Sequence, residues 1–382
     1  MGEDKVSFVQ IVRQTCISGF LLVNHIIMND EKVIVSFVGQ KISKVRWGQS
    51  YNGEKNPCEF ITGSCDDEKN LVCKWKVPTE NDNEPNLESQ LVVEGSVTDL
   101  LVMSPGKVIY SNSNGDVSIV SLSSHDNKMR EDQSWKKLHR YLSTNEVACC
   151  TCLASYGQDI VTGGEDGKIN FLLPERKKPI RVLENADSSN VTGLQFLSST
   201  ELVSINSTGQ LKLWDIRQQK LNKPEKVLTL SGNACPLLSV DKHPNQPHIV
   251  VTGHGDGVVG IWDIRQENGP VTLVDAHEAE VWTVMFHSMY PDNLFTCSQD
   301  GSCWFWDGAS MNNEIIYSNL NNNNSHSHSA WLYIDANKHK METFSLVPFN
   351  KSPINSFDVC LSSLVCATDS EALIIVSDIP VR

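Results

Sequence analysis

A single phrase recurs along this chain: a short apolar strand, a tight polar turn, and a second strand rich in β-branched residues. Seven copies are present: EFITGSCDDEKNLVCKWKV (59–77), VIYSNSNGDVSIVSL (108–122), IVTGGEDGKINFLL (160–173), LVSINSTGQLKLWDI (202–216), IVVTGHGDGVVGIWDI (249–264), LFTCSQDGSCWFWD (294–307) and LVCATDSEALIIVSDI (364–379). The turn glycines of the five central copies are separated by 52, 42, 48 and 44 residues: Gly115, Gly167, Gly209, Gly257 and Gly301. Spacing of this kind indicates a repeat architecture in which each unit buries its apolar face against the next. The chain is therefore predicted to be all-β, with seven similar antiparallel sheets.

The sixth copy, within the stretch from Val271 to Asp307, carries the fullest pattern of polar residues. His277 precedes an apolar alternation, and the residues that follow it are Thr296 in the second strand, Asp300 in the tight turn and Trp306 in the third strand. This order is typical of one blade of a WD40 β-propeller. In that geometry the four side chains hydrogen-bond in series, so that each buried polar group has a partner. We therefore predict a structural tetrad. A hydrolase triad is disfavoured because Thr296 lies in mid-strand, without the sharp turn that exposes a nucleophile.

A propeller needs one strand from near the start of the chain to complete its last sheet, and two segments compete for that place. Lys-Val followed by Ser-Phe-Val occurs at residues 5–9 and again within 32–38. Because 32–38 runs directly into the first inner strand, we assign closure to it. Residues 1–30 are then predicted to be an N-terminal extension outside the propeller core, and 31–382 a seven-bladed propeller.

One segment interrupts the repeat. Residues 308–340 contain four consecutive asparagines, a Ser-His alternation and few apolar residues. Such composition predicts a flexible insertion, which we place between the third and fourth strands of the sixth blade. His326 and His328 lie in it, but two ligands on a flexible loop give a metal ion little affinity.

The charge balance and the apolar pattern limit the classes of partner. The chain carries 46 acidic and 32 basic residues, for a net charge of −14, whereas duplex nucleic acid requires a concentrated cationic surface. No run of eighteen apolar residues is present, so insertion in a membrane is not expected. The GHGDG phrase at 253–257 joins two strands and opens no helix, so it does not predict a phosphate cradle. We expect no cofactor and no small-molecule substrate.

The cysteines do not predict a metal site. Twelve are scattered along the chain, and the cluster Cys149-Cys150-Thr151-Cys152 has no second Cys or His pair at a zinc-ligand spacing. In a regular strand Cys150 and Cys152 share one face and Cys149 points to the other. We interpret them as buried strand thiols in a reducing compartment.

An enzyme is also disfavoured. In propeller hydrolases, polar residues converge on the central channel. The inner strands here are expected to present a mixed set without facing carboxylates: Ser43, Val45, Thr98, Leu100, Cys150, Cys152, Thr192 and Leu194. Since a propeller by itself carries no chemistry, the residues predict a rigid interaction platform.

Several phrases are more specific than the general repeat. FVGQKISKVRW (37–47), ENADSSNVTGLQFL (184–197), GQLKLWDIRQQ (209–219), VDKHPNQPHIVVTG (240–253), GIWDIRQ (260–266) and AHEAEVW (276–282) together resemble the small WD40 nucleoporin family of the Y-shaped outer-ring scaffold. The resemblance covers roughly residues 31–382, and the mass of 42.5 kDa agrees with a family of about forty-three kilodaltons.

The resemblance implies a non-enzymatic scaffold subunit of the nuclear pore complex at the nuclear envelope. Such a subunit docks through a propeller face onto an α-solenoid nucleoporin in the short arm of the Y. It supports pore assembly, mRNA export and protein import, and in mitosis it associates with kinetochores.

Two WDxR boxes give an alternative function. Asp215 and Arg217 lie in the first box, and Asp263 and Arg265 in the second. Such boxes resemble the adaptor-docking feature of WD40 substrate receptors of cullin-RING ubiquitin ligases. An Arg two residues after the Asp lies on the same strand face and could reach an acidic partner. The simpler interpretation is an intramolecular salt bridge to an Asp of the adjacent blade, or plain exposure to solvent.

Overall fold

The computed structural model of the chain describes most of the repeat region and only short parts of the N-terminal extension. The described residues are 11–12, 25–27, 33–48, 57–78, 84–122, 128–218, 223–230, 235–267, 269–309, 329–333, 341–347 and 351–382.

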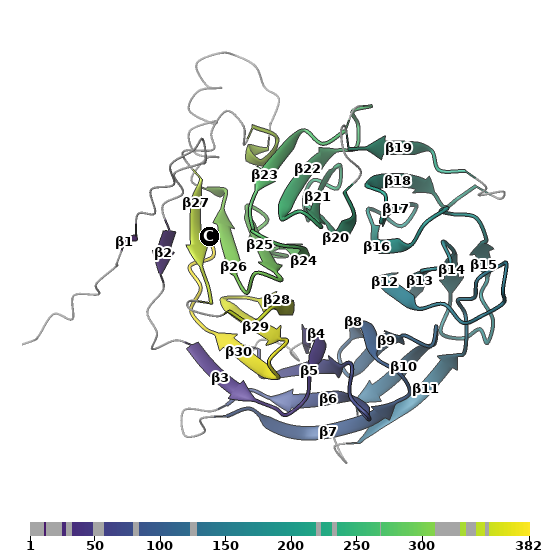
Figure 1. Cartoon of the computed structure of the whole chain (residues 1–382), viewed down its shortest axis with the longest axis horizontal. Helices are drawn as coiled ribbons and strands as arrows, with labels where there is room; N and C mark the ends of the chain where they lie inside the picture. Colours follow the sequence, from purple (N-terminus) through teal and green to yellow (C-terminus); the bar gives the residue numbers. More distant parts are fainter. Residues whose placement is uncertain are drawn as a thin grey trace, which may run out of the picture.

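Seven sheets form a ring, each built on four antiparallel strands with the innermost strand nearest the centre (Figure 1). The first three sheets are β4 (Ile42–Trp47), β5 (Glu59–Ser64), β6 (Asn70–Lys76) and β7 (Asn86–Val93); β8 (Val97–Ser104), β9 (Lys107–Asn112), β10 (Val117–Leu122) and β11 (Met129–Trp135); β12 (Cys150–Tyr156), β13 (Asp159–Gly164), β14 (Ile169–Leu172) and β15 (Arg181–Leu183). The next two are β16 (Val191–Phe196), β17 (Glu201–Asn206), β18 (Gln210–Asp215) and β19 (Lys226–Thr229); β20 (Leu237–Lys242), β21 (Ile249–His254), β22 (Val258–Asp263) and β23 (Thr272–Asp275). The sixth contains β24 (Val281–Phe286), β25 (Asn293–Ser298), β26 (Cys303–Asp307) and β27 (Glu342–Ser345), and the seventh β28 (Ile354–Cys360), β29 (Ser363–Thr368), β30 (Ala372–Val376) and β3 (Val33–Phe37). The predicted seven-bladed propeller is confirmed.

The hydrophobic core lies between the sheets. Each of seven buried clusters joins side chains from two neighbouring sheets, as where Phe60 of the first packs with Leu373 of the seventh. The middle strands are buried on both faces, which explains their continuous apolar runs. Each sheet is therefore stable only with its two neighbours, and the ring must close.

The closing strand is the one predicted from the sequence. β3 pairs antiparallel with β30, from Val33 opposite Val376 to Phe37 opposite Ala372. Ile34 packs into the core between the seventh and first sheets, while Val35 on the other face is 51% exposed. The first and last parts of the repeat region thus share one sheet (Figure 1).

The described parts of the extension lie outside the four strands of the sixth sheet. β2 (His25–Ile27) pairs in parallel with β27, and β1 (Ile11–Val12) pairs antiparallel with β2. The first Lys-Val, Ser-Phe-Val copy, at 5–9, is outside the described residues.

The insertion between β26 and β27 has the predicted place in the sheet, but one end of it belongs to the core. A 3-10 turn, η2 (Ala330–Tyr333), buries Trp331 completely against the fifth and sixth sheets. Residues 329–333 of the predicted flexible insertion (308–340) are therefore part of the packed structure. Residues 310–328 are outside the described part of the chain.

The tight turns need a residue whose backbone adopts the left-handed conformation, with positive φ. Gly257 shows why glycine is best suited to this position. Its φ is 87°, and a Cβ there would lie 2.2 Å from the carbonyl oxygen of His277. The last copy places Glu371, with φ of 62°, at the corresponding position. A side chain is tolerated there at some cost in backbone strain.

Candidate functional site

The four predicted tetrad residues lie together in the sixth sheet. The His277 Nε2 atom lies 2.8 Å from the Thr296 hydroxyl, and the Trp306 indole N–H donates to the same hydroxyl at 3.0 Å. The His277 Nδ1 atom lies 3.3 Å from a carboxylate oxygen of Asp300. The series also includes Ser302, whose hydroxyl lies 2.8 Å from His277 Nδ1 and donates to Asp300 at 2.6 Å. The side chains of Thr296 and His277 are fully buried, so a substrate could not reach them.

Ionisation of Asp300 makes the stability of the folded protein depend on pH. Burial disfavours its ionised form, but hydrogen bonds from His277 and Ser302 outweigh burial and hold the pKa of Asp300 well below its usual value of 3.8. A depressed pKa in the folded state gives stability that is present above the unfolded pKa and is lost as pH falls through the folded pKa.

We expect Asp300→Ala to lower the free energy of unfolding by about 1–3 kcal/mol at pH 7 because it leaves buried donors without an acceptor. The difference from the unsubstituted chain should narrow below about pH 4, where the unfolded carboxylate takes up a proton. Urea unfolding between pH 3 and pH 7 measures it. Asp256 holds the same turn position in the fifth sheet but is exposed; it accepts the Val258 N–H at 3.3 Å and contacts the Cys235 thiol, and no histidine bonds it among the described residues. Asp256→Ala should cost less than about 0.5 kcal/mol, and an equal loss for both variants would contradict the assignment.

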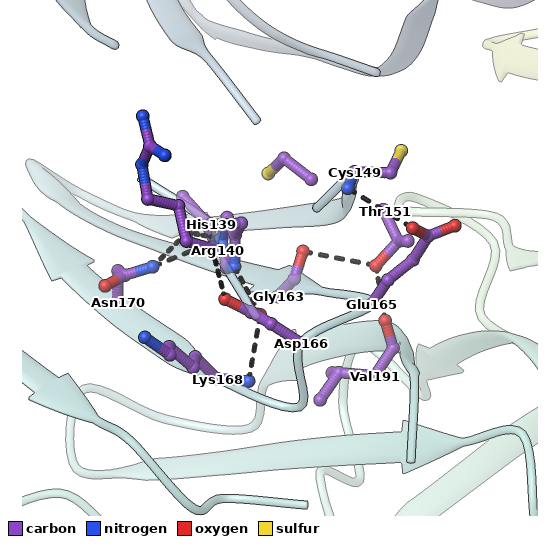
Figure 2. Close-up of polar contacts among 12 residues, drawn as sticks. His139, Arg140, Cys149, Thr151, Gly163, Glu165, Asp166, Lys168, Asn170 and Val191 are labelled. Atoms are coloured by element: carbon purple, nitrogen blue, oxygen red, sulfur yellow. Dashed lines mark hydrogen bonds and ion pairs between the residues drawn. The ribbon is translucent and has the colours of Figure 1, made fainter. Parts of the chain in front are cut away.

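A second network, which the sequence analysis missed, lies in the third sheet (Figure 2). His139 contacts Asp166 through Nδ1 and the Thr162 hydroxyl through Nε2, each at 2.8 Å. The Arg140 N–H donates to Asp166 at 2.8 Å, and burial of Asp166 is again outweighed by its hydrogen bond with His139, so its pKa is lowered. Thr162 and Asp166 have the same four-residue spacing as Thr296 and Asp300, which is the signal that could have revealed the network.

The fifth sheet has no histidine at the position that corresponds to His277, and His254 of its second strand, β21, takes that place. The His254 Nε2 atom lies 2.8 Å from the Thr252 hydroxyl, which also accepts the Trp262 indole N–H at 2.7 Å. His254 follows Thr252 by two residues, so the role passes to a side chain on the same face of the strand. The polar series is thus more widespread than the sequence pattern indicated.

The WDxR arginines do not bridge adjacent blades. Arg217 forms two hydrogen bonds with Asp215, at 2.9 and 2.8 Å, and Arg265 forms two with Asp263, at 2.8 and 2.6 Å. The expected salt bridge to the neighbouring blade is therefore wrong: a turn after each strand folds the arginine back onto its own box. The side chains of Arg217 and Arg265 remain 69% and 60% exposed.

The sixth sheet lacks such an arginine, and a distant residue takes its place. Asp307 ends β26, and Ala309 stands two residues later. Arg382 donates to the buried Asp307 carboxylate at 2.8 Å through Nε, and its backbone N–H donates to Asn293 at 3.0 Å. Arg382 follows the last strand of the seventh sheet in the chain, so this contact attaches the end of the chain to the sixth sheet.

A β-bulge changes which inner-strand residues face the channel. In all seven inner strands the register shifts after the first residue. Val45, Leu100 and Cys150 are fully buried, so their expected place on the channel is wrong. Cys150 and Cys152 pack into different cores, one on each side of the third sheet, because the bulge reverses the alternation between them. Among the described residues no group of His, Cys, Asp or Glu could hold a metal ion.

The bulged residues link neighbouring sheets around the channel. The hydroxyls of Ser43, Thr98, Thr151 and Thr192 each donate to the carbonyl of the first inner-strand residue of the next sheet. Figure 2 shows the contact from Thr151 to Val191. The Asn355 amide makes the same contact, donating to Ile42 at 3.0 Å.

Carboxylates are also present on the inner strands, and two of them, Asp99 and Asp241, line the channel. Each accepts a backbone N–H of the next inner strand: Asp99 from Leu153 at 2.8 Å, Asp241 from Phe286 at 2.8 Å, and Asp358 from Trp47 at 2.7 Å. Burial raises the pKa of Asp241 to about 6. The three belong to the second, fifth and seventh sheets, and their bonds identify them as links between blades rather than a paired acid and base.

The seven-sheet ring and its buried polar series define a WD40-repeat propeller, and the model for "WD domain, G-beta repeat" matches residues 224–263 and 268–307. Nucleoporin Nup43 of Homo sapiens is 37% identical over 372 residues, which cover 90% of this chain and 98% of the relative. The Mus musculus Nup43 has the same identity and coverage. The Dictyostelium discoideum nuclear pore complex protein nup43 is 28% identical over 232 residues, 58% of this chain and 52% of that protein. The chain belongs to the Nup43 family of nucleoporins, and the resemblance predicted from its phrases is confirmed.

One further finding concerns membranes. Within the described ranges, no helix has the length and apolar character needed to cross a bilayer.

Proposed function

We propose that the protein is a non-enzymatic structural subunit of the nuclear pore complex. The observation that carries the proposal is the similarity to Nup43 over 98% of the relative's length, since it includes every blade rather than one shared repeat. The fold is consistent with this role because side-chain hydrogen bonds join neighbouring sheets around the ring and make it a rigid platform.

The finer proposal concerns the partner. The protein docks through a propeller face onto an α-solenoid nucleoporin in the short arm of the Y-shaped outer ring. A hairpin over the third sheet, in which Arg140 pairs with Val147, gives one face an apolar contact: Leu142 at its tip is 63% exposed. Tyr141 and Val147 of the same hairpin are also exposed, at 36% and 37%, and a group of exposed apolar side chains marks a candidate protein-protein contact. Through the assembly the protein supports mRNA export and protein import, and in mitosis it reaches the kinetochore with its partners.

Affinity purification of the tagged chain from its own cells tests the proposal. Outer-ring nucleoporins are expected to dominate the recovered proteins, and a double variant Arg217→Ala, Arg265→Ala should recover them equally well. The ubiquitin-ligase alternative requires the reverse: a cullin adaptor should dominate and should be lost from the double variant. Absence of nucleoporins from the unsubstituted sample would reject the scaffold proposal.

A further inference from the structure

Two positions interrupt the series of polar links around the channel. The seven bulged residues are Ser43, Thr98, Thr151, Thr192, Leu238, Trp282 and Asn355, and of these Leu238 and Trp282 make no side-chain hydrogen bond to the next sheet. In the fifth sheet Ser239 makes a longer contact instead, at 3.3 Å to the Val281 carbonyl. Because a bulge aims its residue out of the regular alternation, both apolar side chains are directed at the channel.

Trp282 is unusual for its exposure. It is 37% exposed, whereas Trp304 is half-buried and the other seven tryptophans are each 8% exposed or less: Trp47, Trp75, Trp135, Trp214, Trp262, Trp306 and Trp331. Among the described residues its ring has no aromatic partner and its indole N–H no hydrogen-bond acceptor. An indole with open surface in a concave place is the kind of side chain that anchors a ligand.

The channel mouth around these residues is large enough for a ligand. Its cavity has a volume of about 520 Å³, within the usual range of binding pockets, and it is lined by Leu238 and Trp282 together with polar groups that include Asn190, Gln299 and Asn355. The side-chain oxygen of Asn190 is buried and has no hydrogen-bond partner among the described residues. The mouth therefore combines an apolar wall with an unused acceptor.

A positive charge without a partner among the described residues lies at the same place. Lys44 lines both the mouth and the deeper channel, and it makes no hydrogen bond or ion pair with any described residue. Its cationic neighbours already have partners: Lys41 pairs with Asp66 at 3.1 Å and Asp369 at 2.9 Å, and Arg46 with Asp99 at 3.7 Å. Lys242, which lines the deeper channel, donates to the Leu197 carbonyl at 2.9 Å. One lysine can pair with one carboxylate group of a ligand. A polyphosphate or nucleic acid would need several cations in one place.

We propose that the channel mouth binds an extended acidic peptide segment of a partner protein. An apolar or aromatic side chain of the peptide packs against Trp282 and Leu238, and an adjacent Asp or Glu carboxylate accepts a hydrogen bond from the Lys44 ammonium group. This site is separate from the scaffold docking proposed above, since it uses the channel rather than the Arg140–Val147 hairpin, and it requires no nuclear pore component.

Selection of peptides from a random twelve-residue phage-displayed library on the immobilised full chain provides the probe. The consensus peptide is then synthesised, with a second version in which its acidic residue is replaced by Gln or Asn. Selected peptides should share an acidic residue next to an apolar one. Fluorescence anisotropy should show binding at least about tenfold weaker for the neutral peptide, for Lys44→Gln and for Trp282→Ser.

Two control variants separate the site from general surface effects. Lys107→Gln removes a half-exposed lysine of the second sheet, and Leu273→Ser removes a 44%-exposed apolar side chain on an outer strand. Both should bind the consensus peptide as the unsubstituted chain does. The side chains of Lys44 and Trp282 form no hydrogen bond or ion pair with a described residue. All four variants should therefore have melting temperatures within a few degrees of the unsubstituted chain.

The proposal is overturned if no peptide is selected, if the selected peptides are basic, or if their binding is unchanged in both channel variants. Recovery of nucleoporins by Lys44→Gln is expected to remain normal. Loss of peptide binding and loss of the scaffold role are therefore distinguishable.

Discussion

Removal of residues 31–38 is expected to lower the free energy of unfolding by several kcal/mol, the largest effect of any change considered. β30 loses its partner along five residue pairs, from Val33–Val376 to Phe37–Ala372, and Ile34 leaves the core between the seventh and first sheets. At about 1 kcal/mol per backbone hydrogen bond and about 1 kcal/mol for the partly buried Ile34, the loss is on the order of 5 kcal/mol. Urea unfolding and the melting temperature measure it.

Two single substitutions make the same test without shortening the chain. Ile34→Ser removes an inward side chain of β3, and Val35→Ser removes its outward neighbour, which is 51% exposed. The first should cost about 1 kcal/mol and the second less than about 0.5 kcal/mol. Equal melting temperatures for the deletion variant and the full chain would rule out closure by β3.

Trp331→Ala is expected to cost about 3–5 kcal/mol, the usual loss for a large aromatic side chain in a core. The ring is fully buried and lies edge-on to Phe286, with ring centroids 5.4 Å apart, among residues of the fifth and sixth sheets that include Val259 and Leu294. The insertion that carries it thus ties two blades together. Thermal unfolding should show the loss as a clear fall in melting temperature.

The matched control is Trp282→Ala, which removes the same side chain from an exposed position and should cost less than about 0.5 kcal/mol. Deletion of 310–328 should also cost little, because η2 remains and a long loop adds little closure entropy. If deletion of 310–328 destabilised the chain as much as Trp331→Ala, the anchor would have to extend beyond Trp331.

Features that depend on repetition could be predicted from the sequence. The seven copies, the closing strand at 32–38 and the grouping of His277 with Thr296 follow from strand alternation and from the fixed period of the repeat. These patterns are readable because each unit must present the same apolar faces to its neighbours.

Features that depend on local exceptions could not be predicted in this way. His139 precedes its Thr by 23 residues instead of 19, and Leu172 stands where the tetrad has Trp, so the third-sheet network did not match the pattern. The burial of Trp331 could not be predicted because this residue lies in an insertion of mostly polar composition. The inner-strand bulges shift the side-chain alternation by one residue, which moved Val45 and Leu100 from the channel into the cores.

The central claim is that one ring of seven sheets is sealed by a strand from near the start of the chain, and hydrogen–deuterium exchange of the intact protein tests it most directly. Peptides that cover Val33–Phe37 should exchange slowly, like those of Ala372–Val376, because the two strands share their hydrogen bonds. Exchange of 33–37 at the rate of an unpaired loop, with β30 equally unprotected on that edge, would show that the ring is open and would contradict the account.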